Sequence, residues 1–113
     1  FVLDRSRIRA VERWDVLLYR DHTLRLLDLG VWAGVETKLD DEPEHVVVVE
    51  LAGEQYGLIT SHVRSREEIV VKPLGWQLRG LAGLAGATIT GDGSIALLLD
   101  LPGLVAARER GAR

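Results

Sequence analysis

Hydrophobic residues occur along most of the chain in short runs of at most five, and polar or glycine residues separate one run from the next. Short apolar runs joined by a polar or glycine-containing pair predict β-hairpins. Two such hairpins are expected in the first half of the chain. They pair 16–20 with 23–27 around Asp21 and His22, and 46–52 with 55–60 around Gly53 and Glu54.

Four consecutive valines, 46–49, open the second of these hairpins. β-Branched side chains lose rotamer freedom in a helix, so this run favours a strand. A continuous apolar run is typical of a strand that is buried on both faces. We therefore expect 46–52 to be a central strand.

A third hairpin is expected near the C-terminus, where Gly91-Asp92-Gly93 separates 87–90 from 94–100. Asp-Gly between apolar runs is a strong hairpin signal, because the tight turn requires positive φ angles. The segment 68–74 predicts another short strand, which ends near Pro73. Recurring glycines between 81 and 91 predict a loop that leads into the third hairpin.

Two short helices are expected. Asp28 is a suitable N-cap for a helix over 28–33, and a second helix is expected after Asp100 up to Arg110. The acidic segment 36–44 predicts a loop. Residues 1–3 are expected to be the end of a strand, and residues 5–11 are expected to form either a helical turn or an irregular connection. Many short strands and few helical patterns together predict a mostly β fold built from small barrels.

The composition limits the class of protein. A chain of 113 residues suits one domain, and 47% hydrophobic with 27% charged residues is typical of a globular protein. A net charge of −3 argues against nucleic-acid binding, and the absence of cysteine excludes disulfides and thiolate chemistry. The longest apolar runs are far below the ~20 residues of a membrane-spanning helix. The absence of cysteine also fits a reducing, cytoplasmic setting. The absence of methionine, even at position 1, suggests a fragment of a longer protein.

The residues that usually carry chemistry lack the required patterns. His22, His45 and His62 do not have metal-ligand spacing, and no serine lies in a G-x-S-x-G motif. Gly91-Asp92-Gly93 joins strand to strand, so it is interpreted as a turn and not as a phosphate-binding loop. We expect no catalytic residue, no metal and no cofactor. Trp76 follows Pro73 and Gly75, and for it core packing and a partner surface both stay open.

Two segments in the second half of the chain carry a family resemblance. They are 68–75, Glu-Ile-Val-Val-Lys-Pro-Leu-Gly, and 81–100, Leu-Ala-Gly-Leu-Ala-Gly-Ala-Thr-Ile-Thr-Gly-Asp-Gly-Ser-Ile-Ala-Leu-Leu-Leu-Asp. They resemble the C-terminal regulatory domain of CheA-type chemotaxis histidine kinases, which is a CheW-like domain. The runs upstream follow the same order and spacing, so the resemblance covers nearly the whole chain. Three departures from the family pattern are Asp21, Arg25 and Ser61.

The resemblance implies that 1–113 is one CheW-like regulatory domain fragment made of two small SH3-like β-barrels, the first of them incomplete at its N-terminus. Open strand edges of that barrel would pair with another chain or swap into a homodimer. The implied function is non-catalytic coupling in the cytoplasm, at the inner face of the membrane through receptor complexes. The implied partners are a CheW-like adaptor and the cytoplasmic tip of a chemoreceptor.

By the same resemblance, the partner surface is expected on both barrels. The candidate residues are Arg20, Leu24, Leu26 and Trp32 in the first barrel and Ile69, Val71, Lys72 and Trp76 in the second. Two alternatives stay open. One is a free-standing CheW-type adaptor, and the other is a small β-barrel that binds a ligand or acts as an enzyme through its aspartates and histidines.

Overall fold

The computed structural model describes residues 1–33, 42–64, 66, 69–70 and 83–109. The chain divides into two compact units, Phe1–Arg64 and Ser65–Arg113, and each unit is described by itself. The fold is mostly β, as the sequence predicts.

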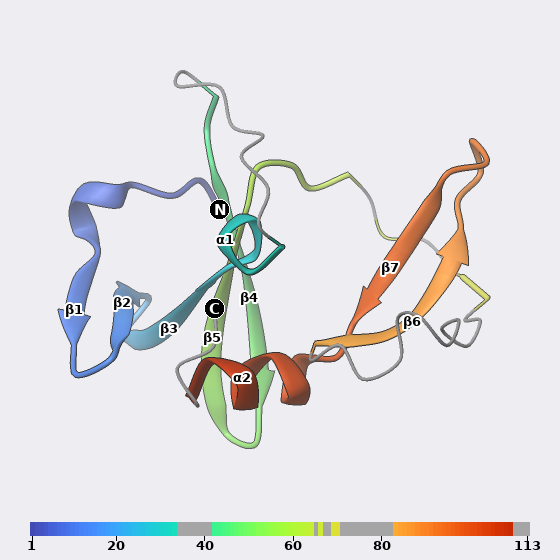
Figure 1. Ribbon diagram of the computed structural model, residues 1–113. Coiled ribbons are helices and arrows are strands. Elements are labelled where there is room, and N and C mark those ends of the chain that lie inside the picture. The colour runs from blue at the N-terminus through green and yellow to red at the C-terminus, as the bar shows by residue number, and fades with distance from the viewer. Residues whose placement is uncertain (34–41, 65, 67–68, 71–82, 110–113) are drawn as a thin grey trace. The chain divides into compact units, whose positions relative to one another are not determined.

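The first unit is built on a five-stranded sheet with the strand order β1-β2-β3-β5-β4 (Figure 1). Its elements are the 3₁₀ helix η1 (Arg5–Arg7), β1 (Arg9–Val11), β2 (Trp14–Tyr19), β3 (His22–Asp28), α1 (Leu29–Ala33), β4 (His45–Leu51) and β5 (Glu54–Thr60). All neighbouring strands are antiparallel except β3 and β5, which are parallel. Parallel neighbours need a crossover, and the chain between them passes through α1 and β4.

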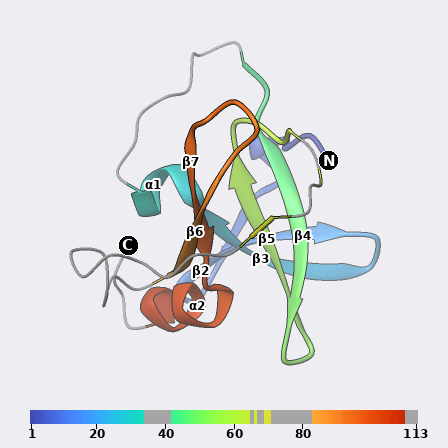
Figure 2. The ribbon, with the colours of Figure 1, turned by 90° about the vertical axis from the view of Figure 1, so that its right-hand side faces the viewer.

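Both hairpins predicted in the first half are confirmed (Figure 2). Arg20 and Asp21 form the turn between β2 and β3 with φ of 47° and 64°, and Ala52 and Gly53 form the turn between β4 and β5 with φ of 53° and 81°. Two successive positive φ angles match the twist of the flanking strands. Both turns lie one residue earlier than predicted, because His22 already belongs to β3 and Glu54 already belongs to β5.

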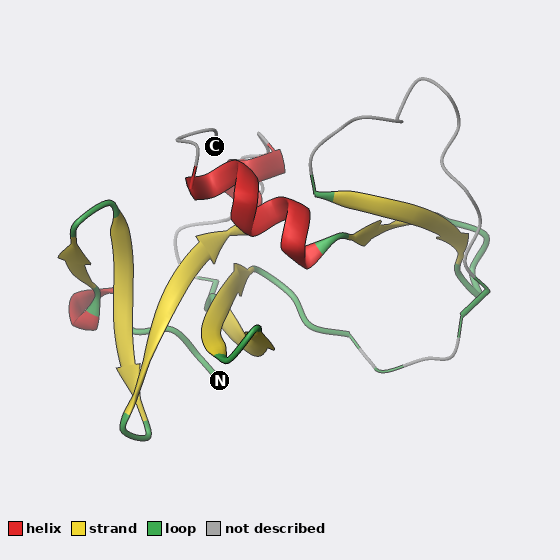
Figure 3. Ribbon diagram, turned by 90° about the horizontal axis from the view of Figure 1, so that it is seen from below, coloured by secondary structure: helices red, strands yellow, loops and turns green. Residues whose placement is uncertain are grey.

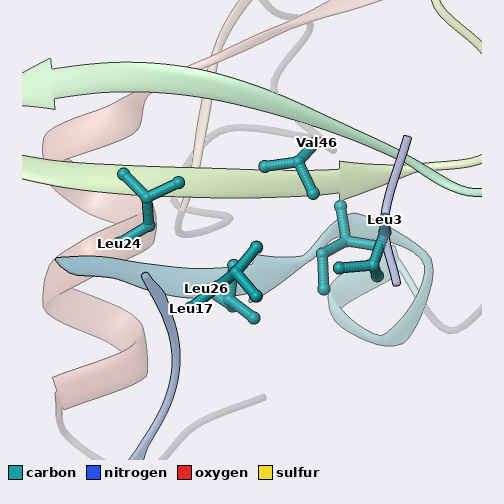
Figure 4. Packing of buried hydrophobic residues seen from close by; sticks show 6 residues of the cluster. Leu3, Leu17, Leu24, Leu26 and Val46 are labelled. Carbon is teal, nitrogen blue, oxygen red and sulfur yellow. The ribbon is translucent and has the colours of Figure 1, made fainter. Parts of the chain in front are cut away.

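One face of this sheet carries the core. Leu17, Leu24, Leu26, Val46 and Ile59 form the main hydrophobic cluster and pack together with Leu3 (Figure 4). The register explains why these side chains meet. Leu17 lies opposite Leu24, and Val46 lies opposite Ile59, so each pair projects from the same face of the sheet.

The prediction that the valine run is buried on both faces was wrong. β4 lies at the end of the strand order, and Val47 and Val48 are 36% and 40% exposed. An edge strand has only one full neighbour, so its side chains are covered less well than those of a central strand. At the start of β4, Val2 forms an isolated antiparallel bridge with His45, which confirms that residues 1–3 are extended.

Residues 5–7 form the 3₁₀ helix η1, which agrees with the alternative of a helical turn, whereas the strand β1 over 9–11 was not predicted. Asp4 caps the short helix, because its Oδ1 accepts hydrogen bonds from the Ser6 amide at 3.0 Å and the Ser6 hydroxyl at 2.6 Å. A side-chain acceptor at this position satisfies an amide that has no partner inside the helix.

The second unit contains the hairpin of β6 (Leu84–Ile89) and β7 (Ile95–Leu99), followed by α2 (Leu101–Glu109) (Figure 3). The predicted hairpin and the predicted C-terminal helix are confirmed. The prediction of a loop over 81–91 was wrong, because β6 occupies most of that segment. The pairing shifts between Leu84 and Gly86, and a glycine at such an irregularity is compatible with a strand.

Neither sheet closes into a barrel among the described residues. The described residues of the first unit form five strands, and those of the second unit form two. The predicted strand over 68–74 lies outside the described residues except for Ile69 and Val70, which are exposed.

Candidate functional site

Arg20 lies at the tip of the β2–β3 hairpin and is exposed. Its guanidinium carbon is 5.2 Å from the centre of the Tyr19 ring, and the Tyr19 ring stacks on Phe1 with centroids 4.1 Å apart and an angle of 7°. A cation above an aromatic face is attracted by the ring quadrupole. The aromatic pair therefore supports a cationic side chain at this tip.

Trp32 lies in α1 and is half-buried, while the neighbouring Val31 is 56% exposed. α1 contacts β3 and β5, and its first amides are capped by Asp28. This confirms Asp28 as an N-cap. Together, Val31 and Trp32 form an accessible apolar surface on a short helix, which we call the α1 surface.

Leu24 and Leu26 do not belong to an accessible surface. Leu24 is 0% exposed and Leu26 is 5% exposed, and both pack in the core of the first unit. They lie on the inner face of β3, so a partner reaches neither side chain unless the core opens. The prediction that Leu24 and Leu26 are surface contacts was therefore wrong. The register of the sheet decides which face of β3 is buried, and the residue pattern of one strand does not reveal this register.

In the second unit, Ile69 is 46% exposed. The other three candidates there, Val71, Lys72 and Trp76, lie outside the described residues. The accessible candidate contacts that the structure describes are therefore Arg20 and the α1 surface in the first unit and, in the second unit taken by itself, Ile69.

A polar cluster lies next to α1 and was not predicted. Arg5 donates from Nε to Glu44 Oε1 at 2.6 Å and from a terminal nitrogen to Glu44 Oε2 at 2.7 Å, and the same nitrogen lies 3.3 Å from Asp28 Oδ2. The hydrogen bond to Glu44, together with the charges of both carboxylates, raises the pKa of Arg5. Arg5 and Glu44 are separated by 39 positions, so no local pattern in the sequence indicates this pair.

Two of the three departures from the family pattern have a clear structural setting. The guanidinium carbon of Arg25 lies 5.6 Å from the centre of the Trp14 ring, and Trp14 in turn contacts Tyr56 with centroids 6.0 Å apart. Asp21 occupies the second position of the β2–β3 turn with positive φ, where aspartate is tolerated better than most residues. Ser61 directly follows β5.

The three histidines lie in different segments: His22 begins β3, His45 begins β4, and His62 follows β5. In the part of the chain that the structure describes, no three histidine, cysteine or acidic side chains come together as a metal site. Among these same residues, no helix is long and apolar enough to cross a bilayer.

Comparison with known proteins gives a consistent result. The model of the CheW-like domain matches residues 2–109. The chain is 35% identical over 100 residues to the sensor histidine kinase CheAY of Helicobacter pylori. The match covers 88% of this chain and 12% of that protein. It is 30% identical over 105 residues to the chemotaxis protein CheA of Bacillus subtilis. This match covers 92% of this chain and 16% of that protein.

Among solved structures, the scaffolding protein TtCheW from Thermoanaerobacter tengcongensis has a similar fold. The TM-score is 0.66 with 19% sequence identity, and the match covers 80% of this chain and 65% of that chain. The chain spans only about an eighth of the length of the first curated relatives that it matches. Because the family model covers almost every residue, the chain belongs to the family of CheW-like domains.

Proposed function

We propose that the chain is the non-catalytic coupling module of a chemotaxis histidine kinase. The observation that carries this proposal is the match of the CheW-like model to residues 2–109 together with relatives named CheA and CheAY. These names favour a module within a kinase over a free-standing adaptor. In this proposal residues 1–113 act as one regulatory domain, and any phosphotransfer belongs to other parts of the parent protein.

The proposed partners are a CheW-like adaptor and the cytoplasmic tip of a chemoreceptor, so the module would work in the cytoplasm next to the membrane. Two separate features of the first unit support this proposal: the exposed cation Arg20 before β3 and the apolar α1 surface after β3. Aromatic and arginine side chains dominate the binding energy of many protein interfaces. Arg20 and Trp32 are therefore the proposed anchors in the first unit, and Ile69, Val71, Lys72 and Trp76 are the proposed contacts in the second.

The test is a binding titration of the chain with a purified CheW-type adaptor by isothermal titration calorimetry. We expect Arg20→Ala and Trp32→Ala each to weaken binding about tenfold or more, which corresponds to ~1.4 kcal/mol. Arg64→Ala is the control for the arginine, because Arg64 is also exposed in the first unit. Val63→Ala is the control for loss of an exposed apolar side chain.

Both controls should bind like the unmodified chain. Absence of adaptor binding at low and at moderate salt would contradict the coupling function itself. Binding that is unaffected by Arg20→Ala and Trp32→Ala would leave the coupling function in place and reject the proposed anchors.

A further inference from the structure

The guanidinium of Arg5 connects three segments that are distant in sequence. Arg5 belongs to η1, Glu44 directly precedes β4, and Asp28 ends β3. Arg5 binds the Glu44 carboxylate with two parallel hydrogen bonds of 2.6 and 2.7 Å and reaches Asp28 Oδ2 at 3.3 Å. A planar guanidinium that bonds a carboxylate at two points has a fixed orientation, which a single point charge does not have.

The two carboxylate oxygens of Asp28 have different partners. Oδ1 accepts hydrogen bonds from the amides of Gly30 at 3.0 Å and Val31 at 3.2 Å, while Oδ2 faces Arg5. One side chain therefore ties the first turn of α1 to the guanidinium. A rotation of this carboxylate would disturb the cap and the ion pair together.

Glu44 provides the fixed end of this connection. Its side chain is only 10% exposed, and its backbone carbonyl accepts a hydrogen bond of 2.8 Å from the amide of Leu3, which is a core residue. The Arg5 side chain remains 53% exposed. The Arg5 guanidinium thus connects Glu44, whose backbone is bonded to a core residue, with Asp28 at the beginning of α1.

α1 needs such an anchor, because it has only five residues and none of them is buried. A helix this short is not stable by itself, and the usual source of helix stability is a buried apolar face. Leu29 and Trp32 are only half-buried against the sheet, so the polar contacts at the N-terminus of α1 add to this limited packing. The same helix presents Val31 and Trp32.

We propose that Arg5 is a positioning residue that holds the α1 surface in the orientation in which the adaptor binds it. This inference rests on the proposed function only for the identity of the partner. The positioning itself is a property of the chain and is measurable without a partner.

The first measurement is nuclear magnetic resonance of the chain alone. Arg5→Gln and Asp28→Asn should each shift the indole N–H signal of Trp32 and the methyl signals of Val31, while the methyl signals of Leu24 stay in place. Asparagine keeps an acceptor for the helix cap, so Asp28→Asn removes mainly the charge opposite Arg5. The matched control is Arg9→Gln, because Arg9 donates to the carbonyls of Ser6 and Ile8.

The second measurement is adaptor affinity. Arg5→Gln and Asp28→Asn should each weaken binding at least threefold, and Arg5→Lys should lose less than Arg5→Gln. Arg5 and Asp28 act through one contact. The double variant, with both Arg5→Gln and Asp28→Asn, should therefore bind the adaptor no more weakly than the single variant with the lower affinity. Arg9→Gln should bind normally. The core variant Val46→Ala is the control for a general loss of folding stability. Measured well below its unfolding temperature, it should also bind the adaptor normally.

The proposal is overturned if the Trp32 and Val31 signals do not move in Arg5→Gln, whether or not the adaptor binds. It is also overturned if the losses from Arg5→Gln and Asp28→Asn add up in the double variant, since additive losses indicate direct contacts of each side chain with the partner. If the unmodified chain does not bind the adaptor but the signals move as expected, the proposed function fails while the positioning of α1 by Arg5 stands.

Discussion

Gly57 and Val46 lie so close together that a side chain on Gly57 has no space. A Cβ atom at Gly57 would be 2.8 Å from Cγ1 of Val46 and 2.9 Å from Cδ2 of Leu26. Gly57 is buried on β5, between the strand that carries Leu26 and the strand that carries Val46. The absence of a side chain at this point lets the core leucine and valine meet across the sheet.

Gly57→Ala should therefore lower the free energy of unfolding by about 1–3 kcal/mol, because an added methyl group in a packed core forces neighbouring side chains to move. Chemical denaturation measures this change. Gly91→Ala is the control, since no atom lies within 4 Å of a Cβ at Gly91. A Gly57→Ala variant as stable as Gly91→Ala would show that the core around Val46 is looser than described.

Leu24→Ala should cost about 2–5 kcal/mol of folding stability, because it empties space in the core where Leu24 is 0% exposed. Leu18→Ala on the neighbouring strand should change stability by less than about 0.5 kcal/mol, since Leu18 is 60% exposed. Thermal unfolding of the two variants compares them directly. Equal losses would contradict the assignment of Leu24 to the core.

Ala52→Asn should stabilise the β4–β5 hairpin by up to about 1 kcal/mol. Ala52 has a φ of 53°, a left-handed conformation that is costly for most residues and easier for asparagine. Asn-Gly at 52–53 is also the preferred pair for such a turn. Ala52→Val should have the opposite effect, because a β-branched residue is especially unfavourable at positive φ. An unfolding midpoint that is lower for Ala52→Asn than for the unmodified chain would contradict this turn geometry.

Asp4 should titrate at an unusually low pH. The hydrogen bonds from the Ser6 hydroxyl and the Ser6 amide hold the pKa of Asp4 below its ordinary value of 3.8. The folded pKa is lower than the unfolded one, so protonation favours the unfolded state. The stabilising contribution is present above about pH 4 and is lost as the pH falls through the folded pKa.

Carbon-13 titration of the Asp4 carboxyl group measures this shift. Ser6→Ala should raise the pKa of Asp4 toward its ordinary value, because it removes the largest cause of the shift. Ser94→Ala, in the β6–β7 loop, should leave the Asp4 titration unchanged. A titration of Asp4 at its ordinary pKa in the unmodified chain would contradict the cap geometry of η1.

Much of the local structure could be predicted from the sequence, because it depends on neighbours in the chain. The three hairpins, the cap at Asp28 and the C-terminal helix follow from alternating apolar residues, turn residues and capping residues. The candidate site was predicted less well. Arg20 and Trp32 are accessible or partly accessible as expected, whereas Leu24 and Leu26 are buried.

The sequence by itself determined most of the strands, turns and helices, since these depend on steric and hydrogen-bonding preferences of adjacent residues. It did not predict β1 or the first residues of β6. Only the tertiary structure decided that the valine run lies at a sheet edge, that β3 runs parallel to β5, and that Arg5 meets Glu44 beside Asp28. Strand order and long-range ion pairs depend on which distant segments bury each other's apolar faces. A periodicity of two within one strand shows that its two faces differ but does not show which face the rest of the chain covers.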